Sequence, residues 1–543
     1  MLFLFVILGF VRSILRSLLV LVWIEPWSKP QVNGDAPPLT YEAWYDEQSD
    51  SDAIRGVDDW AVMDRHPRYD WQVLRTMKKD LERCRRLGDE RALCSQLRAQ
   101  SSRNMCRVLS PALYRRSHIQ TKKLIHDYVQ EVQQCIRYLG ERTGVTNGAA
   151  SVVPAQERRQ VIVDMRTTLG RTSLVLQGGA MISMSHLGVV KALYKRQLLP
   201  RIITGTSSGA LIAAHICVTK DEDLPGVLEA THINLDAFLR SQNDHSASGA
   251  SSWLQSSFFA TMQRRYRRYR TSHHVFDIDV LKECTRDNLG DITFEEAYHK
   301  TGRILNITIA MSEVTGTPQL LNYLTAPHVL VRSAVVASIA TSKAMYAPVQ
   351  LLCKDPAGDI VMYFAADFSE KDHDHRQSTV HPEAPLTRIG ELFNVNHFIV
   401  SQTRPYIAPF IQLQKSADRH QPLGLLVRFT LSELRHWLEV LNRFNMLPTF
   451  LQRVLMDEVV PTMASWSKVS ITPQIGLLDF FRTFDTPTPA KLQYWSARGE
   501  ECTWPYICEL KVRCDIELEL DTAYTSLRRR GGMGSTIRHR ADP

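Results

Sequence analysis

The chain has 543 residues, of which 44% are hydrophobic and 22% are charged, a composition typical of globular proteins with about two to four domains. Its ten cysteines form neither a CxxC pair nor a His/Cys metal spacing, which argues against a zinc-type site and favours reduced thiols in a cytosolic compartment. The net charge of +8 is mild, but arginines gather at residues 264–270 and 528–540. Such clusters suit anionic lipid head groups, nucleic acid or a solvated surface.

The N-terminal segment 1–27 is the one strongly apolar stretch of the chain. Residues 1–11 carry no charge, but Arg12 and Arg16 interrupt the segment before it ends at Trp27. Arginine is costly in hydrocarbon, and this spacing places both arginines on one helical face. We therefore expect an interfacial membrane or lipid-droplet anchor, or two short insertions, more than a simple span. The position of the arginines inside the apolar region disfavours a secretory signal.

A linker and a helical domain are expected next. Residues 28–40 are rich in proline and polar residues, which is typical of a linker. Residues 41–150 are charged and helix-favouring, and apolar residues recur at helical spacing between Leu124 and Leu139. This pattern predicts a helical N-terminal domain over 41–150.

From Arg171 onward, strand and helix signals alternate. Residues 172–176 predict a short buried strand, which a glycine-rich turn and a helix follow. A second strand ends near Ile203, ahead of a helix over 210–218. Further strands are expected at 304–310 and 360–364. The alternation predicts an α/β fold with a parallel sheet.

The remaining C-terminal part shows a different texture. Residues 401–515 predict a mainly helical C-terminal region. Residues 516–543 contain several arginines and end in a glycine-rich stretch, which predicts a basic and partly disordered tail.

The pentapeptide from Gly205 to Gly209 matches the GxSxG nucleophile elbow of serine hydrolases, with Ser207 at its centre. Small residues at both ends let neighbouring backbone come close while the chain turns sharply from strand to helix. The helix after Ser207 would direct its positive end toward a developing oxyanion. The pentapeptide is short and also occurs as a structural turn, but its place between a strand and a helix favours Ser207 as a nucleophile.

The glycine-rich turn Gln177–Ala180 can present free N–H groups to an anion. It lacks the lysine of a phosphate loop, and Ser183 stands where a dinucleotide-binding loop would have its third glycine. A nucleotide phosphate and an oxyanion are both possible occupants. The nucleophile elbow that follows so soon favours an oxyanion hole.

Asp367 follows the apolar residues 360–364, where a strand would present a side chain at its C-terminal end. A carboxylate that is desolvated beside a serine can take the proton of that serine. An ordinary turn aspartate is the alternative. A Ser-His-Asp triad also stays open, because several histidines follow Asp367, namely His373, His375, His381, His397, His420 and His436.

The order of these motifs resembles the patatin-like phospholipases. LQGG at 176–179, HLG at 186–188, GTSSGALIAA at 205–214 and FAADFSE at 364–370 occur in sequence. The chain is similar to the fungal triacylglycerol lipases of lipid droplets, from about residue 41 to 530. The resemblance implies a patatin-like three-layer α/β/α sandwich with helical N-terminal and C-terminal regions.

The resemblance also implies a catalytic domain over 171–400 and a Ser–Asp dyad without histidine. Ser207 would be the nucleophile and Asp367 would activate it, and an acyl-enzyme on Ser207 would be hydrolysed by water. The oxyanion hole would consist of the backbone of Gly178, Gly179 and Ala180. No cofactor and no metal are implied.

The chain departs from the family pattern at three positions. Ala180 and Ser183 replace glycines, which costs little where φ is negative and more where it is positive. Phe368 follows Asp367 where glycine is usual, so its bulk could turn the carboxylate or narrow the site.

These observations lead to one principal hypothesis and two alternatives. The leading hypothesis is a triacylglycerol lipase in lipid catabolism, bound to a lipid droplet or to the endoplasmic reticulum membrane on the cytosolic face. Its substrate would be a triacylglycerol or a phospholipid, and no nucleic-acid partner is expected. The alternatives are a catalytically impaired lipid-surface protein and a lysophospholipid acyltransferase.

Overall fold

The computed structural model describes most of the chain from residue 40 onward. Apart from single positions, the described ranges are 40–141, 153–238, 267–309, 319–340, 346–363, 384–404, 467–475 and 487–538. The predicted anchor 1–27, Asp367 and Phe368 lie outside them. None of the helices in these ranges combines the length and the apolar character that crossing a bilayer requires.

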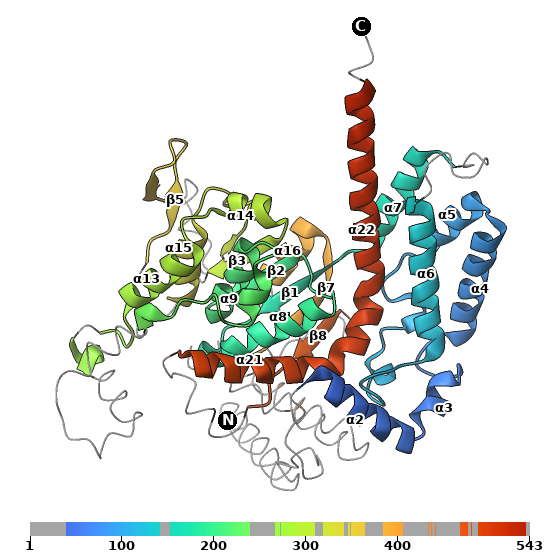
Figure 1. Cartoon of the computed structure of the whole chain (residues 1–543), viewed down its shortest axis with the longest axis horizontal. Helices are drawn as coiled ribbons and strands as arrows, with labels where there is room; N and C mark the ends of the chain where they lie inside the picture. The colour runs from blue at the N-terminus through green and yellow to red at the C-terminus, as the bar shows by residue number, and fades with distance from the viewer. Residues whose placement is uncertain are drawn as a thin grey trace.

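The N-terminal helices lie to one side of the sheet (Figure 1), and they contribute most of a hydrophobic core that is separate from that of the sheet. Helices α4 and α6 carry apolar residues on one face, so Leu74, Leu81, Ile125 and Ile136 are fully buried between them. The elements of this domain are α2 (Tyr41–Ile54), α3 (Val57–Val62), α4 (Trp71–Leu87), α5 (Glu90–Ala99), η1 (Met105–Arg107), η2 (Pro111–Leu113), α6 (Lys123–Glu141) and α7 (Ala155–Leu169).

The C-terminal helix α22 (Ile507–Arg538) completes this core, and Figure 1 shows it standing between the helical domain and the sheet. Val512, Leu520 and Ala523 of α22 are buried against α6 and α7. A basic, partly disordered tail was predicted over residues 516–543, and the structure differs in that residues 516–538 continue α22. The prediction followed the arginines and glycines near the end of the chain and missed the apolar residues that α22 buries.

The central sheet has six strands in the order β4-β3-β2-β1-β7-β8. All neighbouring strands are parallel except the edge pair of β3 and β4. Parallel strands covered on both faces favour continuous apolar runs, which explains why every residue of β3 is buried. The strands are β1 (Arg171–Leu176), β2 (Ile202–Thr206), β3 (Ile304–Ile309), β4 (Gln319–Leu321), β7 (Val395–Ser401) and β8 (Lys468–Ile471).

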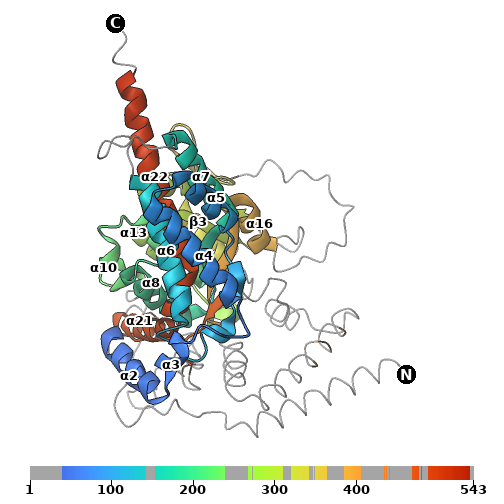
Figure 2. The same cartoon turned by 90° about the vertical axis from the view of Figure 1, so that its right-hand side faces the viewer.

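Helices cover both faces of this sheet, with α8 on one side and α16 on the other (Figure 2). This three-layer α/β/α arrangement confirms the predicted fold class. The helices of this part are α8 (Ser185–Lys195), α9 (Ser208–Val218), α10 (Leu224–Leu228), α13 (Ile278–Leu289), α14 (Phe294–Thr301), α15 (Val331–Ile339), α16 (Ala384–Phe393) and α21 (Pro489–Thr503), with the short turns η3 (Ala180–Met184) and η5 (Trp504–Tyr506).

Two segments beyond residue 400 belong to the sheet layers. Strand β8 pairs with β7, and α21 packs closely on α8. The helix contact depends on two glycines, because a Cβ on Gly188 would lie 1.8 Å from the Ser496 carbonyl oxygen and one on Gly499 would lie 1.9 Å from that of Ser185. The layers around the sheet therefore include residues beyond 400, the boundary that was predicted for the catalytic domain.

Strands β5 (Leu352–Lys354) and β6 (Ile360–Met362) form a separate antiparallel hairpin. All three side chains of β6 are exposed. The strand expected at 360–364 is observed at 360–362, but it pairs with β5 and does not belong to the parallel sheet. An apolar run of this length fits a buried strand and an exposed hairpin equally well, and only the pairing partner decides between them.

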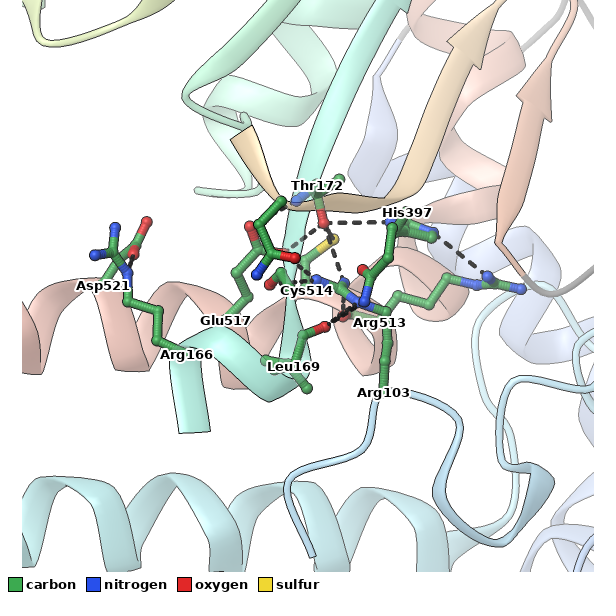
Figure 3. A network of polar contacts seen from close by, with 12 residues as sticks. Arg103, Arg166, Leu169, Thr172, His397, Arg513, Cys514, Glu517 and Asp521 are labelled. Carbon is green, nitrogen blue, oxygen red and sulfur yellow. Dashed lines mark hydrogen bonds and ion pairs between the residues drawn. The ribbon is translucent and has the colours of Figure 1, made fainter. Parts of the chain in front are cut away.

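A buried polar network joins the helical domain, the sheet and α22, as Figure 3 shows. Arg103 forms an ion pair of 2.8 Å with Glu517 of α22 and donates to the carbonyl oxygens of Leu169 and Gly170 at 3.2 and 3.0 Å. Glu517 in turn accepts the backbone N–H of Thr172, in β1, at 2.8 Å. We call this group the domain seam. It fixes the N-terminal end of β1 to the two helical elements beside it.

Candidate active site

The elbow lies at the C-terminal end of β2, where the chain turns into α9. Ser207 has φ 55° and ψ −128°, a conformation that costs a residue other than glycine about 1–3 kcal/mol. Both flanking glycines are required by close backbone approach. A Cβ on Gly205 would lie 2.5 Å from Ala210 Cα, and one on Gly209 would lie 2.2 Å from the Leu176 carbonyl oxygen. The strand, the strained serine and the helix together have the geometry of a nucleophile elbow.

The glycine-rich loop after β1 lies against the elbow. A Cβ on Gly178 would lie 2.7 Å from Ser207 Cβ and 3.1 Å from Ser207 Oγ. A Cβ on Gly179 would lie 2.3 Å from the Thr403 carbonyl oxygen, so a side chain has no room at either position. The fold thus brings the predicted oxyanion loop to the predicted nucleophile.

The hydrogen bonds of this loop show which of the predicted oxyanion donors already have an acceptor. The Gly179 N–H donates to Ser208 Oγ at 3.1 Å. In the described part of the chain, no acceptor is bonded to the Gly178 N–H. The Gly178 N–H is therefore not committed to a partner in this part of the chain, whereas that of Gly179 is already bonded to Ser208.

The two residues that replace glycine in this loop, Ala180 and Ser183, differ in backbone conformation. Ala180 has φ 52°, the left-handed region that favours glycine, so the methyl group adds strain there. Ser183 does not have positive φ, and its buried hydroxyl lies 2.7 Å from Ser208 Oγ and 3.3 Å from Thr403 Oγ1. Hydrogen bonds therefore accommodate the Ser183 side chain. Ala180 instead adopts a positive φ that alanine disfavours.

His186 supports the loop from beneath. Its Nε2 lies 2.6 Å from the Gln177 carbonyl oxygen and its Nδ1 lies 2.7 Å from Ser401 Oγ. A carbonyl oxygen can only accept, so Nε2 carries the proton and Nδ1 accepts from the serine hydroxyl. Burial lowers the pKa of His186 to about 4, so the ring is neutral near pH 7. This histidine orients the loop and does not exchange protons with Ser207.

His397 cannot complete a triad with Ser207. It lies in β7 beside Thr172, near the N-terminal ends of the strands, whereas Ser207 follows the C-terminal end of β2. Burial, and then the charges of Arg103 and Arg513, hold the pKa of His397 well below its ordinary value. His397 contacts the domain seam through Thr172, whose Oγ1 lies 3.3 Å from His397 Nδ1 (Figure 3).

One polar contact of the elbow was missed by the sequence analysis. The Ser207 N–H donates to Ser338 Oγ, near the end of α15, at 2.8 Å. Ser338 stands in a run of small residues, and no motif distinguishes it from the other serines of the chain. Only the packing of α15 beside β3 brings it to the elbow.

Comparisons with known families agree with this geometry. A family model described as patatin-like phospholipase matches residues 174–360, which contain the glycine-rich loop and the elbow. A second model, described as a domain of unknown function (DUF3336), matches residues 38–167, which contain α2 to α6 and most of α7.

Curated relatives align with about nine tenths of the chain. Triacylglycerol lipase ptl3 of Schizosaccharomyces pombe is 31% identical over 497 residues, which cover 90% of this chain and 96% of the relative. Triacylglycerol lipase ptl1 of the same organism is 30% identical, with coverages of 89% and 82%. Triacylglycerol lipase SDP1L of Arabidopsis thaliana is 30% identical, with coverages of 90% and 57%. These matches confirm the resemblance: the chain belongs to the patatin-like phospholipase family of carboxylic-ester hydrolases that act on lipids.

Proposed function

We propose that the protein is a triacylglycerol lipase with Ser207 as nucleophile and Asp367 as the base that activates it. The observation that carries the proposal is the strained Ser207 at the C-terminal end of the sheet, with the backbone of Gly178 beside its hydroxyl. The choice of substrate class rests on the relatives named triacylglycerol lipase, two of which align with more than four fifths of their own length.

The proposed reaction has two steps. Ser207 Oγ attacks the acyl carbonyl carbon while the Asp367 carboxylate takes the hydroxyl proton, and the alcohol of the glyceride leaves with that proton. Water then attacks the acyl-enzyme and gives a proton to Asp367. The bond between the acyl carbon and Ser207 Oγ breaks, the fatty acid leaves, and Asp367 returns the proton to Ser207 Oγ. The N–H groups of Gly178, Gly179 and Ala180, together with the N-terminal end of α9, would stabilise the negative charge on the carbonyl oxygen.

The test is fatty-acid release from emulsified triacylglycerol, with phospholipid vesicles as a second substrate. We expect Asp367→Asn to lower kcat by about 10²- to 10⁴-fold, the usual contribution of a general base. Asp359→Asn is the matched control, because Asp359 is an exposed aspartate of the preceding hairpin. Hydrolysis of phospholipid alone would contradict the assigned substrate, and full activity of Asp367→Asn would contradict the dyad.

The impaired lipid-surface protein is the outcome if neither substrate is hydrolysed. The positive φ of Ala180 is the structural observation that favours it, because a strained residue stands in the predicted oxyanion loop. Product that forms only with an added lysophospholipid acceptor would instead indicate the acyltransferase.

We also propose that residues 1–27 attach the enzyme to a lipid droplet or to the endoplasmic reticulum membrane, on the cytosolic face. The motive is the apolar segment with Arg12 and Arg16 on one helical face. Deleting residues 1–27 should move the protein from the membrane or droplet fraction to the soluble fraction of a cell lysate. An unchanged distribution would contradict the anchor, whatever the catalytic result.

A further inference from the structure

We propose that Ser338 is a positioning residue for the nucleophile. Its hydroxyl connects the backbone of the elbow to strand β3 and holds Ser207 in the strained conformation that hydrolysis requires. Ser338 is fully buried near the end of α15, so it acts through Ser207 and does not touch the substrate. The inference rests on the proposed role of Ser207 as nucleophile.

The two hydrogen bonds of Ser338 have fixed directions. Ser338 Oγ lies 2.7 Å from the carbonyl oxygen of Thr308 and 2.8 Å from the backbone nitrogen of Ser207. A carbonyl oxygen can only accept, so the hydroxyl proton points to Thr308. The oxygen of the hydroxyl then accepts the N–H of Ser207. Both functions of this one hydroxyl are in use, and a side chain without an oxygen can supply neither.

The N–H of Ser207 needs such an acceptor because of its place in the chain. Ser207 follows the last residue of β2 and precedes the first residue of α9, where a backbone N–H has no partner within the helix. A strained conformation persists only where its surroundings determine it. In this conformation the Ser207 N–H points to Ser338 Oγ, which accepts its hydrogen bond.

Strand β3 holds the elbow at a second point, through the side chain of Thr308. Thr308 Oγ1 donates to the Gly205 carbonyl oxygen at 3.4 Å and lies 2.6 Å from Thr206 Oγ1. Thr206 and Thr308 also face each other in the register of β2 and β3. Thr308 and Ser338 thus form hydrogen bonds with three consecutive residues, 205–207. The bond from Ser338 is the one that involves the nucleophile itself.

The same bond decides which backbone group can serve the oxyanion. Because the Ser207 N–H is taken by Ser338, it is not free to donate to an acyl oxygen. Loss of Ser338 should therefore misplace the nucleophile without removing a contact to the lipid. The expected signature is a lower kcat and a nearly unchanged KM.

The experiment compares Ser338→Ala with Ser333→Ala in the full chain. Ser333 is the matched control because it is a buried serine of the same helix whose hydroxyl bonds to Leu330 and Leu352, away from the elbow. We expect Ser338→Ala to lower kcat and the rate of fluorophosphonate labelling about 10- to 100-fold, with KM within about twofold of wild type. Ser333→Ala should leave the labelling rate unchanged.

One further measurement, combined with the labelling rate, separates this inference from the proposed function. Amide hydrogen exchange of the peptide containing residues 205–211 should become faster in Ser338→Ala and not in Ser333→Ala. If wild type is active and Ser338→Ala keeps its labelling rate and its exchange rate, the positioning role is wrong and the lipase assignment stands. If wild type neither labels nor releases fatty acid, the proposed function fails and the inference fails with it.

A second variant covers the case in which Ser338→Ala does not fold. Ser338→Cys keeps nearly the same size, and its thiol is a weak donor and a weak acceptor. We expect it to fold and to label more slowly than wild type. A Ser338→Cys protein with the wild-type labelling rate and exchange rate would overturn the inference.

Discussion

Replacing Ser207 by alanine should abolish acyl-ester turnover, with a loss in kcat of roughly 10⁴-fold or more. The variant keeps the glycine-rich loop and the helix behind the elbow, but it has no oxygen that can form the acyl-enzyme. Fluorophosphonate labelling should disappear as well, because the probe reports an activated serine without assuming a lipid substrate. The measurement is labelling of wild type and variant at equal concentration, followed by fatty-acid release.

The neighbouring serine offers the control for this result. Ser208 accepts the Gly179 N–H at 3.1 Å and lies 2.7 Å from Ser183 Oγ, so its hydroxyl is occupied by the loop. Ser208→Ala should still be labelled. If labelling persists in Ser207→Ala and disappears in Ser208→Ala, then Ser208 is the nucleophile and the assignment of Ser207 is wrong.

The sequence predicts the first half of the sheet well because the signals there are local. A strand expected at 172–176 is observed as β1, Arg171–Leu176, and one expected at 304–310 is observed as β3, Ile304–Ile309. Each contains several aliphatic residues within five or six positions and is followed by a different texture in the sequence. The elbow is predictable because its serine and two glycines stand within five consecutive residues, although the contact that requires Gly209 is with Leu176 of another strand.

Features that depend on distant partners could not be predicted. Strand β8 has four residues in a region expected to be mainly helical, and it is a strand because it pairs with β7. The Ser338 contact joins residues 131 positions apart, and nothing local to Ser338 indicates it. Strand β6 is the reverse case. Its apolar residues suggested a buried strand, but no layer covers them and all three are exposed.

Replacing Arg103 by alanine should destabilise the protein by about 3–5 kcal/mol, the usual effect of removing one partner of a buried ion pair. The side chains of Arg103 and Glu517 are only 3% and 10% exposed. Without the guanidinium, the Glu517 carboxylate stays buried, and the carbonyl oxygens of Leu169 and Gly170 lose a donor. Urea unfolding of wild type and variant measures the difference in the free energy of unfolding.

An exposed pair in the same domain provides the comparison. Arg98 and Asp164 form an ion pair of 2.9 Å with side chains that are 39% and 38% exposed, so Arg98→Ala should cost at most about 1 kcal/mol. A double variant, Arg103→Met with Glu517→Leu, should recover only part of the loss. It removes both charges, but the Thr172 N–H and the carbonyl oxygens of Leu169 and Gly170 still lose a hydrogen-bond partner.

The domain seam lies at the end of the sheet opposite Ser207. A substitution in the seam should therefore change the free energy of unfolding without changing kcat. Thr172, its contact in β1, pairs near the start of the strand, whereas Leu176 at the other end pairs with Gly205 of the elbow. Arg103→Ala should therefore keep the wild-type kcat at temperatures where it remains folded. A variant that is as stable as Arg98→Ala would show that the seam does not hold the helical domain to the sheet. A fully folded variant with a lower kcat would show instead that the position of β1 governs the elbow.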